Sequence, residues 1–420
     1  MTHFNVMIIG GGTAGITVAA QMTRKDKSLK IGLIEPSEKH YYQPAWTLVG
    51  AGTFDFKKTE RKEADYIPKG VEWIKDYAYS FDPENNKVTT KNGSEYTYDY
   101  LVVAPGLVVD FSLLPGLKEA METDSVGSIY TDPESFWEKL QNFKGGNAVF
   151  TQASTPIKCG GAPQKIMYLS EHYFRKKGIR DKVNVIFATP GTVIFGVKEI
   201  AKTLNKIIID RDINLKTYYA PIKIDGVKKE ITYRFTNSHL QNCAMVVDSN
   251  LGEDIVGESE IKMKYDLLHL APPQRAPDFI IESPFSYQEG PNKGWLEVDH
   301  YTLQHKKFPN VFGLGDVVAL PTAKTGAAVR KQAPVVVENI FNLIKSNSLG
   351  ESKYEGYSSC PLVTGYGKMV LAEFKYNNVR DSDPVISKLV DTNKEQYSMW
   401  ILKKYGLPFM YWNLMLKGRA

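Results

Sequence analysis

Cysteine is scarce in this chain of 420 residues, which has only three and no Cys-x-x-Cys motif. Three cysteines cannot build a stapling disulfide framework, so the fold must be held together by packing. Two of them, Cys159 and Cys360, lie 201 positions apart beside glycine or proline. They are either buried small hydrophobic residues or a redox pair joining two distant segments. The third, Cys243, has no such neighbours, and we expect it to be structural and dispensable.

Long hydrophobic runs and strong charge are also missing. No window of about 18 consecutive apolar residues occurs, so the sequence predicts no membrane-spanning helix. The chain enters a strand-like run directly from Met1, without a charged and then apolar leader, and we expect the protein on the cytoplasmic side. A net charge of +5, from 52 basic and 47 acidic residues, argues against a nucleic-acid partner.

The chain begins with a nucleotide-binding pattern. An apolar run at 4–9 predicts a buried strand, and it leads into Gly10-x-Gly12-x-x-Gly15 and a helix. Gly10 permits the tight turn, Gly12 lets a pyrophosphate approach the backbone, and Gly15 allows the helix to pack closely. Each glycine therefore has a separate steric task.

The start of that helix and the next strand extend the pattern. Thr13 and Ala14 lie at the helix N-terminus, where oriented N–H groups bind phosphate. A second strand at 30–34 ends in Glu35, 20 positions after Gly15. This is the spacing of a carboxylate that binds the ribose hydroxyls of an adenosine.

Two later strands also end in glycine turns. Residues 98–106 form a strand that closes on Gly106, and residues 308–316 form a strand that delivers Asp316 through Gly-x-Gly-Asp. These paired signatures resemble those of the flavoproteins with two dinucleotide-binding domains, the disulfide reductase superfamily. The resemblance implies FAD at the first site, with Asp316 near its ribityl and pyrophosphate region.

A second glycine fingerprint is missing. The strand at 148–151 leads into Gln-Ala-Ser-Thr-Pro, which puts side chains where a pyrophosphate needs bare backbone. We therefore do not expect NAD(P)H to be the electron donor. Cys159 follows this turn and precedes a helical pattern, so the helix dipole and Lys158 or Lys165 would favour its thiolate.

With these residues in hand, the chain resembles the sulfide:quinone oxidoreductases of mitochondria and some bacteria over nearly its whole length. The most specific stretches are 35–52, 158–165, 320–325 and 357–366. The resemblance implies that sulfide attacks a Cys159–Cys360 disulfide, or a trisulfide, and that Cys360 keeps the persulfide. Electrons pass through FAD to a membrane quinone, and a small acceptor such as glutathione, coenzyme A or sulfite removes the sulfur.

The same resemblance suggests further cofactor contacts. Gln43 and Ala78 are expected beside the FAD, and Lys324 is expected at the pyrimidine edge of the flavin, where a cation would stabilise the reduced ring. Cys243 lies outside any flavin-attachment motif, so non-covalent FAD is expected. No metal site is expected. His40 and His172 are interpreted as structural histidines rather than as acids or bases.

Two other functions remain open. A type II NADH:quinone dehydrogenase shares the fold and the membrane habit, but it should have the second glycine fingerprint. A non-catalytic flavin-binding interaction protein, resembling the apoptosis-inducing flavoproteins, would leave both cysteine motifs without a role.

The C-terminal end has no acidic residue between 396 and 420, and it is rich in Trp, Tyr, Met and Leu. Two short amphipathic segments, broken at 406–408, are typical of an interfacial membrane anchor, although a helix docked on the core would show the same pattern. We expect a peripheral or monotopic protein on the cytoplasmic face of a bacterial inner membrane, or on the matrix face of the mitochondrial inner membrane.

The expected fold class is α/β, with two doubly wound Rossmann-like domains and a C-terminal membrane-associating helical segment. An FAD-binding domain would combine 1–115 with 294–347, and a second Rossmann-like domain without a nucleotide fingerprint would span 116–293. Polar and apolar residues alternate at 223–265, which predicts a β-rich meander within that insertion. Residues 348–420 would supply Cys360 and the membrane face.

Overall fold

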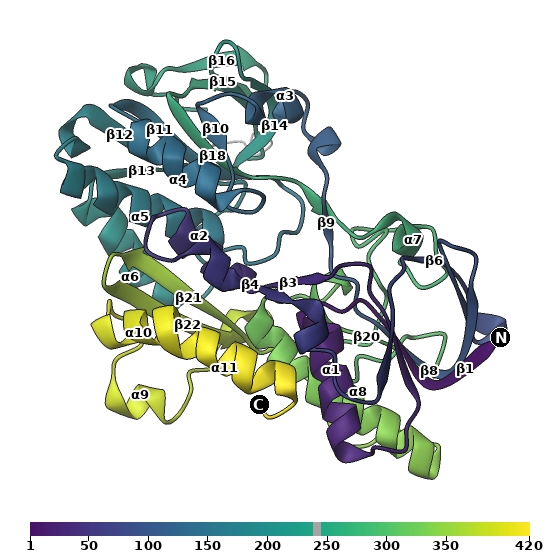
Figure 1. Ribbon diagram of the computed structural model, residues 1–420. Helices are drawn as coiled ribbons and strands as arrows, with labels where there is room; N and C mark the ends of the chain where they lie inside the picture. Colours follow the sequence, from purple (N-terminus) through teal and green to yellow (C-terminus); the bar gives the residue numbers. More distant parts are fainter. Residues whose placement is uncertain (238–244) are drawn as a thin grey trace.

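The computed structural model describes residues 1–237 and 245–420, and it contains two sheets of mainly or wholly parallel strands (Figure 1). The first sheet has seven strands. In spatial order they are β5 (Val71–Ile74), β2 (Ile31–Ile34), β1 (Thr2–Ile9), β8 (Glu95–Val103), β7 (Lys87–Thr90) and β6 (Ala78–Asp82), with β20 (Val311–Gly313) paired to β8. Strands β1, β2, β5, β8 and β20 are parallel, and β6 and β7 form an antiparallel extension.

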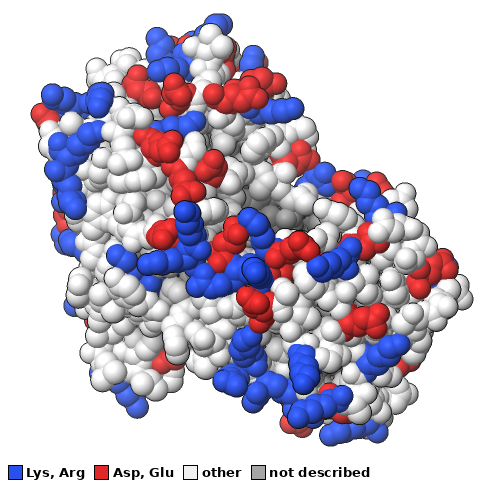
Figure 2. Space-filling model, viewed as in Figure 1, with Lys and Arg blue, Asp and Glu red and all other residues white. Residues whose placement is uncertain are grey.

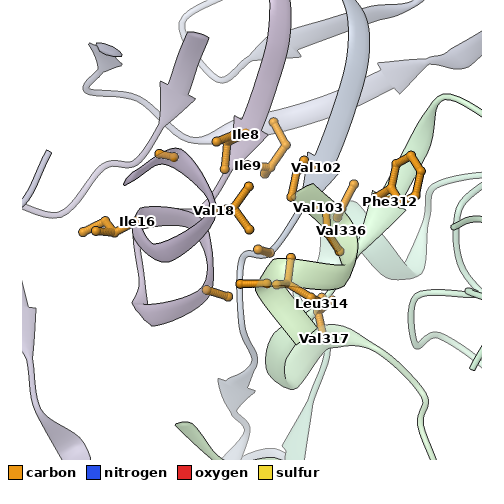
Figure 3. Packing of buried hydrophobic residues seen from close by; sticks show 14 of the residues in the cluster. Ile8, Ile9, Ile16, Val18, Val102, Val103, Phe312, Leu314, Val317 and Val336 are labelled. Atoms are coloured by element: carbon orange, nitrogen blue, oxygen red, sulfur yellow. The ribbon is translucent and has the colours of Figure 1, made fainter. Parts of the chain in front are cut away.

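The core of this first unit lies between the sheet and two helices, α1 (Thr13–Lys25) and α8 (Gly326–Ser346). Apolar side chains of β1, β8 and β20 meet those of both helices, as the labelled residues of Figure 3 show. The strands read as unbroken apolar runs because both faces of a parallel sheet are covered. Since β20 and α8 come from the far side of a long stretch of other elements, this sheet and its helices combine two separate parts of the chain. The division into domains with the expected boundaries stays a prediction.

The second unit contains a five-stranded sheet that is parallel throughout. Its strands, in spatial order, are β10 (Val126–Gly127), β18 (Leu267–Ala271), β11 (Gly146–Gln152), β12 (Val183–Ala188) and β13 (Ile213–Lys216), and its helices are α4 (Pro133–Asn142), α5 (Ala162–Lys177) and α6 (Lys198–Asp210). The predicted meander is confirmed as an antiparallel sheet of four strands, β14 (Tyr219–Asp225), β15 (Glu230–Phe235), β17 (Glu260–Lys264) and β16 (Glu253–Gly257).

Shorter elements connect these units. The remaining strands are β3 (Lys39–Tyr41), β4 (Glu60–Lys62), β9 (Val108–Val109) and β19 (Gln274–Arg275), and the remaining short helices before residue 300 are α2 (Trp46–Val49), α3 (Leu117–Met121) and α7 (Asp278–Ile281). Strand β9 pairs with β19 where the chain passes between the two units (Figure 1).

The segment after β11 differs from a nucleotide-binding turn. The next helix, α5, begins only at Ala162, so residues 153–161 form a loop. This loop is tied to the β18–β19 connection, because Ala153 N–H donates to the Ala271 carbonyl and Gln274 N–H donates to the Thr155 hydroxyl. The loop delivers Cys159 just before the helix, as predicted.

The C-terminal part forms a hairpin and a run of helices. The hairpin consists of β21 (Ser358–Gly365) and β22 (Lys368–Lys375), with β23 (Val379–Arg380) beside it. The helices are α9 (Ile386–Leu389), α10 (Tyr397–Ile401), a π-helical turn at Leu402–Gly406, α11 (Leu407–Asn413) and a 3₁₀ turn at Met415–Lys417. In Figure 1 the yellow helices α10 and α11 lie below β21 and β22.

The expected break at 406–408 is wrong. Gly406 and Leu407 have right-handed helical backbone angles, and helix runs from α10 through the π turn into α11. Pro408 lies within this continuous run and has no N–H to donate to the preceding turn, which is the π-helical one. The wider π turn absorbs the irregularity that proline and glycine would otherwise turn into a break.

No helix in the described part of the chain is long and apolar enough to cross a membrane.

Candidate active site

Of the three glycines of the Gly-x-Gly-x-x-Gly motif, one position is open and two are closed. A Cβ on Gly10, whose φ is +96°, would lie 2.5 Å from the carbonyl oxygen of Ala104, and a Cβ on Gly15 would overlap the carbonyl oxygen of Gly10. A Cβ on Gly12 would meet no described atom within 4 Å. Gly10 and Gly15 are therefore needed by the fold, whereas Gly12 leaves room for a ligand against the backbone.

Two carboxylates lie beside this loop. The Glu35 carboxylate accepts hydrogen bonds of 2.7 Å from the N–H groups of Gly11 and Ser37, while burial raises the pKa of Glu35. The second carboxylate, Glu63, was not anticipated. Its Oε1 is buried without a hydrogen-bond partner among the described residues, 2.6 Å from where a Cβ on Gly11 would lie. An acceptor left unpaired at this place suits a donor such as a sugar hydroxyl.

The late Gly-x-Gly-Asp motif closes the other side of the loop. A Cβ on Gly315 would lie 3.2 Å from the Cβ of Ala14, and Gly315 N–H donates to the Gln332 side chain. Burial raises the pKa of Asp316, although Lys324 and Lys158 act in the opposite direction. Gly106 has φ +74°, and a Cβ there would again meet no described atom within 4 Å. The open sides of Gly12 and Gly106 fit the extended dinucleotide, FAD, that the sequence predicts.

Lys324 lies beside this motif. Its Nζ donates to the carbonyl oxygens of Asp316 and Val318, each at 2.7 Å, and lies 4.2 Å from the centre of the Trp295 ring. Burial lowers the pKa of Lys324 to about 8. It precedes the N-terminus of α8, which is capped by the Thr325 hydroxyl. Contact with the flavin edge stays a prediction for this side chain.

The two other expected cofactor residues lie in different places. Gln43 accepts a hydrogen bond of 2.5 Å from Lys158 Nζ, so it faces the cysteine-bearing loop. Ala78 is buried at the start of β6, where it pairs with Thr90. Their contacts with FAD also stay predictions.

Cys159 has a strained backbone held by its neighbours. Its φ is +50°, in the left-handed region that residues other than glycine seldom adopt. Its N–H donates to the Lys324 carbonyl at 2.8 Å, and its own carbonyl accepts from the Tyr130 hydroxyl at 3.1 Å and from Ala162 N–H at 2.8 Å. Such strain persists only where the surroundings impose it, and it concentrates at functional sites.

Cys360 comes from β21 and meets Cys159 beneath the start of α5. It is 3% exposed, and a Cβ on Gly161 would lie 2.5 Å from its Sγ, so only glycine fits at that position. Both residues are free thiols in this structure. The structure thus brings together the two cysteines that the sequence singled out.

The pKa values of the two cysteine thiols are shifted in opposite directions. A hydrogen bond from Cys360, and then the charge of Lys165, lower the pKa of Cys159 well below the ordinary thiol value. The bond to Cys159 and burial raise the pKa of Cys360 well above it. Lys165 Nζ donates to Cys159 Sγ at 3.0 Å, and the negative sulfur outweighs burial to raise the pKa of Lys165. Cys159 is therefore the thiolate and Cys360 the thiol.

Of the two lysines considered for this role, only Lys165 bonds to the sulfur, because Lys158 is directed to Gln43. A further lysine, Lys403 of the π turn, was not anticipated as a site residue and is 2% exposed. Its Nζ donates to the Pro44 carbonyl at 2.8 Å, and burial followed by the charge of Lys165 lowers the pKa of Lys403 to about 7. Lys403 lies one helical turn after the buried Met399, but the burial of this face could not be read from the sequence.

The histidines have structural partners. His40 is buried between Glu63 and Tyr411, and both ring nitrogens have hydrogen-bond partners. His172 accepts from Tyr366 N–H, and burial lowers its pKa to about 4. Cys243 lies outside the described residues. Within 1–237 and 245–420, no group of His, Cys, Asp and Glu side chains could hold a metal ion.

Comparison with known proteins adds an independent line of support. Residues 4–338 match the family model of the pyridine nucleotide-disulphide oxidoreductases. The chain is 42% identical to the mitochondrial sulfide:quinone oxidoreductase of Mus musculus, over 99% of this chain and 87% of that protein. It is also 42% identical to the mitochondrial sulfide:quinone oxidoreductase of Dictyostelium discoideum, over 99% of this chain and 86% of that protein.

Among solved structures, the fold is similar to that of the sulfide:quinone oxidoreductase from Aquifex aeolicus, with a TM-score of 0.79 and 21% identity over 100% of this chain and 92% of that one. NDH2 from Plasmodium falciparum has a TM-score of 0.63 at 12% identity, over 100% of this chain and 99% of that one, which shows a shared fold alone. From the family model and the full-length relatives, the chain belongs to the pyridine nucleotide-disulphide oxidoreductase family and, within it, to the sulfide:quinone oxidoreductases.

Proposed function

We propose that this FAD-dependent sulfide:quinone oxidoreductase oxidises sulfide at Cys159 and Cys360. The observation that carries the proposal is the paired site itself: Cys360 Sγ lies against Gly161 at the start of α5, and Lys165 Nζ of the same helix lies 3.0 Å from Cys159 Sγ. Because the pKa of Cys159 is lowered and the pKa of Cys360 is raised, the two sulfur atoms are prepared for different tasks.

In the oxidised pair joined by a disulfide, hydrosulfide attacks the Cys360 sulfur. A new bond forms between the incoming sulfur and Cys360, the bond to Cys159 breaks, and its electron pair leaves on the Cys159 sulfur. Disulfide exchange is faster when the leaving thiol has the lower pKa, and in this pair that thiol is Cys159. The persulfide therefore forms on Cys360. Because Cys360 is almost fully buried, a small attacker is favoured.

A small acceptor, such as glutathione, coenzyme A or sulfite, then attacks the outer sulfur of the persulfide and carries it away. Its electron pair displaces the Cys360 thiolate. When the Cys159–Cys360 bond re-forms, two electrons are released. FAD, bound without a covalent link, supplies the two-electron carrier between the cysteines and a quinone. In a resting trisulfide the same attack would break the bond between Cys360 and the bridging sulfur, and the electron pair would leave on a Cys159 persulfide.

Buried cations favour the anionic steps. Lys165 stabilises the departing Cys159 thiolate, and Lys403 contributes a second positive charge whenever it is protonated. Both lysines lie where a negative sulfur species must enter, and a cation in a site of low dielectric acts strongly on such charge. Tyr130 and Lys324 hold the Cys159 backbone, which keeps the sulfur in position between turnovers.

We further propose that the helices after β23 lie on a membrane surface and admit the quinone. Tyr397, Ile401, Tyr405 and Phe409 recur every four residues and are all exposed, and Leu389 of α9 is exposed as well. Figure 2 shows a largely uncharged region at the lower left, over these helices, with Lys and Arg gathered beside it. This composition suits an interfacial surface on the cytoplasmic face of a bacterial inner membrane or the matrix face of the mitochondrial one.

The test mixes the anaerobic holoprotein with sulfide and follows flavin absorbance, then adds a short-chain quinone. Sulfide should bleach the flavin and quinone should restore it. Cys159→Ser and Cys360→Ser should each abolish both changes, whereas Cys243→Ser, the matched control, should react like the wild type. The proposal fails if sulfide leaves the flavin oxidised, or if both site variants still reduce quinone with sulfide.

NADH provides the second arm of this experiment. We expect no useful rate of bleaching, because residues 153–161 form a cysteine-bearing loop where a nucleotide-binding turn would have to be. Rapid bleaching by NADH would instead favour a type II NADH:quinone dehydrogenase. If the protein responded to neither reductant, it would be a non-catalytic flavin-binding protein.

A further inference from the structure

A buried chain of side chains connects the glycine loop to the C-terminal segment. The Tyr411 hydroxyl, on α11, lies 2.7 Å from the Thr13 hydroxyl and 2.6 Å from His40 Nε2. His40 Nδ1 lies 3.0 Å from Glu63 Oε2. Thr13 is the first residue of α1, directly after the open position at Gly12. Four residues that are far apart in sequence therefore meet behind the cofactor-binding loop.

The partners of this chain fix its direction. A carboxylate can only accept, so His40 Nδ1–H donates to Glu63. When the imidazole is neutral, His40 Nε2 accepts from the Tyr411 hydroxyl, and the phenol oxygen accepts from Thr13. Tyr411 is only 6% exposed, and its burial with the ring of Tyr42, whose centre is 4.7 Å away, leaves the hydroxyl little freedom. The Thr13 side chain is therefore held from one side by α11.

Other contacts dock the same segment on the same unit. Lys417 Nζ donates to the Asp65 carbonyl at 2.9 Å and lies 4.5 Å from the centre of the Tyr66 ring. A Cβ on Gly418 would lie 2.8 Å from the backbone of Ala20 in α1, so the chain end packs directly along that helix. Figure 1 shows the C-terminus beside α1. The docked segment thus supports α1 at its first turn and along its length.

We propose that Tyr411 is a positioning residue of the FAD site. By bracing Thr13, it keeps the free N–H groups of the first turn of α1 directed toward the open side of Gly12, and it makes retention of FAD depend on docking of the C-terminal segment. This inference rests on the proposed FAD site but needs neither sulfide nor quinone. A positioning role differs from ordinary packing because it predicts that substitutions at Tyr411 and Thr13 have coupled effects on FAD binding.

The first test measures the dissociation constant of FAD for the apoprotein by quenching of flavin fluorescence. Tyr411→Phe keeps the ring and removes only the hydroxyl, and it should weaken FAD binding roughly three- to tenfold, as expected for one lost buried hydrogen bond. Tyr405→Phe is the matched control, since this tyrosine of the π turn is exposed, and it should bind FAD like the wild type.

A double-mutant cycle shows whether the effect passes through Thr13. Thr13→Val should also weaken FAD binding, and adding Tyr411→Phe to it should cause no further loss. If Tyr411→Phe binds FAD as tightly as the wild type, or if its effect is the same size in the Thr13→Val background, the proposal is wrong. Urea unfolding of each apoprotein separates loss of affinity from loss of fold.

Coupling must also act in the reverse direction. FAD added to the wild-type apoprotein should slow amide hydrogen exchange in α11, and this protection should be smaller in Tyr411→Phe. Exchange in α11 that is indifferent to FAD would overturn the inference. Since these readouts contain no sulfide, a protein that holds FAD in this coupled way but ignores sulfide would refute the proposed reaction alone.

Discussion

At the scale of single residues, Lys165 adds to the effect of Cys360 in lowering the pKa of Cys159. Its ammonium bonds directly to the sulfur, and removing an opposite charge at such a distance raises a depressed pKa. Lys165→Met should therefore raise the pKa of Cys159. The check is the pH dependence of alkylation of the reduced protein by iodoacetamide, where the midpoint for Cys159 should move to higher pH. Lys202→Met, an exposed lysine on α6, should leave the midpoint unchanged.

The pH dependence of Cys159 alkylation follows from the direction in which its pKa is shifted. Because the Cys159 pKa is lowered in the fold, its thiolate persists as the pH falls below the ordinary thiol range, and reactivity disappears only when the pH passes the lowered value. In Lys165→Met this loss should begin at a higher pH. A wild-type midpoint at the ordinary thiol value would contradict the assigned roles.

Gly10 and Gly12 should separate folding from binding. Gly10→Ala places a Cβ 2.5 Å from a carbonyl oxygen at φ +96°, and should destabilise the apoprotein by about 2 kcal/mol or more. Gly12→Ala adds its methyl group to open space, so it should leave urea unfolding of the apoprotein nearly unchanged while weakening FAD binding at least tenfold. Equal effects of the two substitutions on either measurement would show that the open side of Gly12 is not the cofactor site.

Local sequence was enough to predict several of these residues. Gly10, Gly12 and Glu35 were found because each has a steric or hydrogen-bonding task at a fixed spacing within one strand–turn–helix unit. Glu63 and Lys403 were not found, since neither belongs to a motif and their positions depend on segments that meet only in the folded chain.

At the scale of elements, the helical run from α10 to α11 has one buried and one exposed face. Lys403 and Tyr411 point inward, whereas Tyr405 and Phe409 are exposed, Phe409 by 62%. The π turn between them was not predicted, because glycine and proline together are usual signs of a break. The wider π turn allows the helix to continue past glycine and proline, with its buried face and its exposed face both preserved.

Membrane binding should depend on that exposed face. Phe409→Ser should lower partitioning onto anionic vesicles by about tenfold, which corresponds to the lost burial of one aromatic side chain. Flotation of the protein with vesicles measures the effect. Val227→Ser removes a more exposed apolar side chain from the turn between β14 and β15, and should leave flotation unchanged. If both variants bind vesicles like the wild type, this face is not the membrane surface.

At the scale of the whole molecule, the sequence predicted the parallel α/β architecture, the inserted second unit and the antiparallel meander. These features follow from strand runs, glycine turns and alternation that can be read locally. The meeting of Cys159 with Cys360 came from family resemblance rather than from spacing, and the contact of Thr13 with Tyr411 came only from the structure. Contacts between distant segments depend on how whole units pack, and one sequence carries no direct signal for them.

The central claim is that Cys159 leaves as a thiolate and Cys360 keeps the sulfur. The most direct measurement is the mass of the two cysteine peptides after the oxidised protein reacts with one equivalent of sulfide, without an acceptor, and free thiols are blocked. The peptide with Cys360 should gain the mass of one sulfur atom together with the blocking group. The peptide with Cys159 should carry the blocking group without added sulfur. Added sulfur found only on the Cys159 peptide would contradict this account.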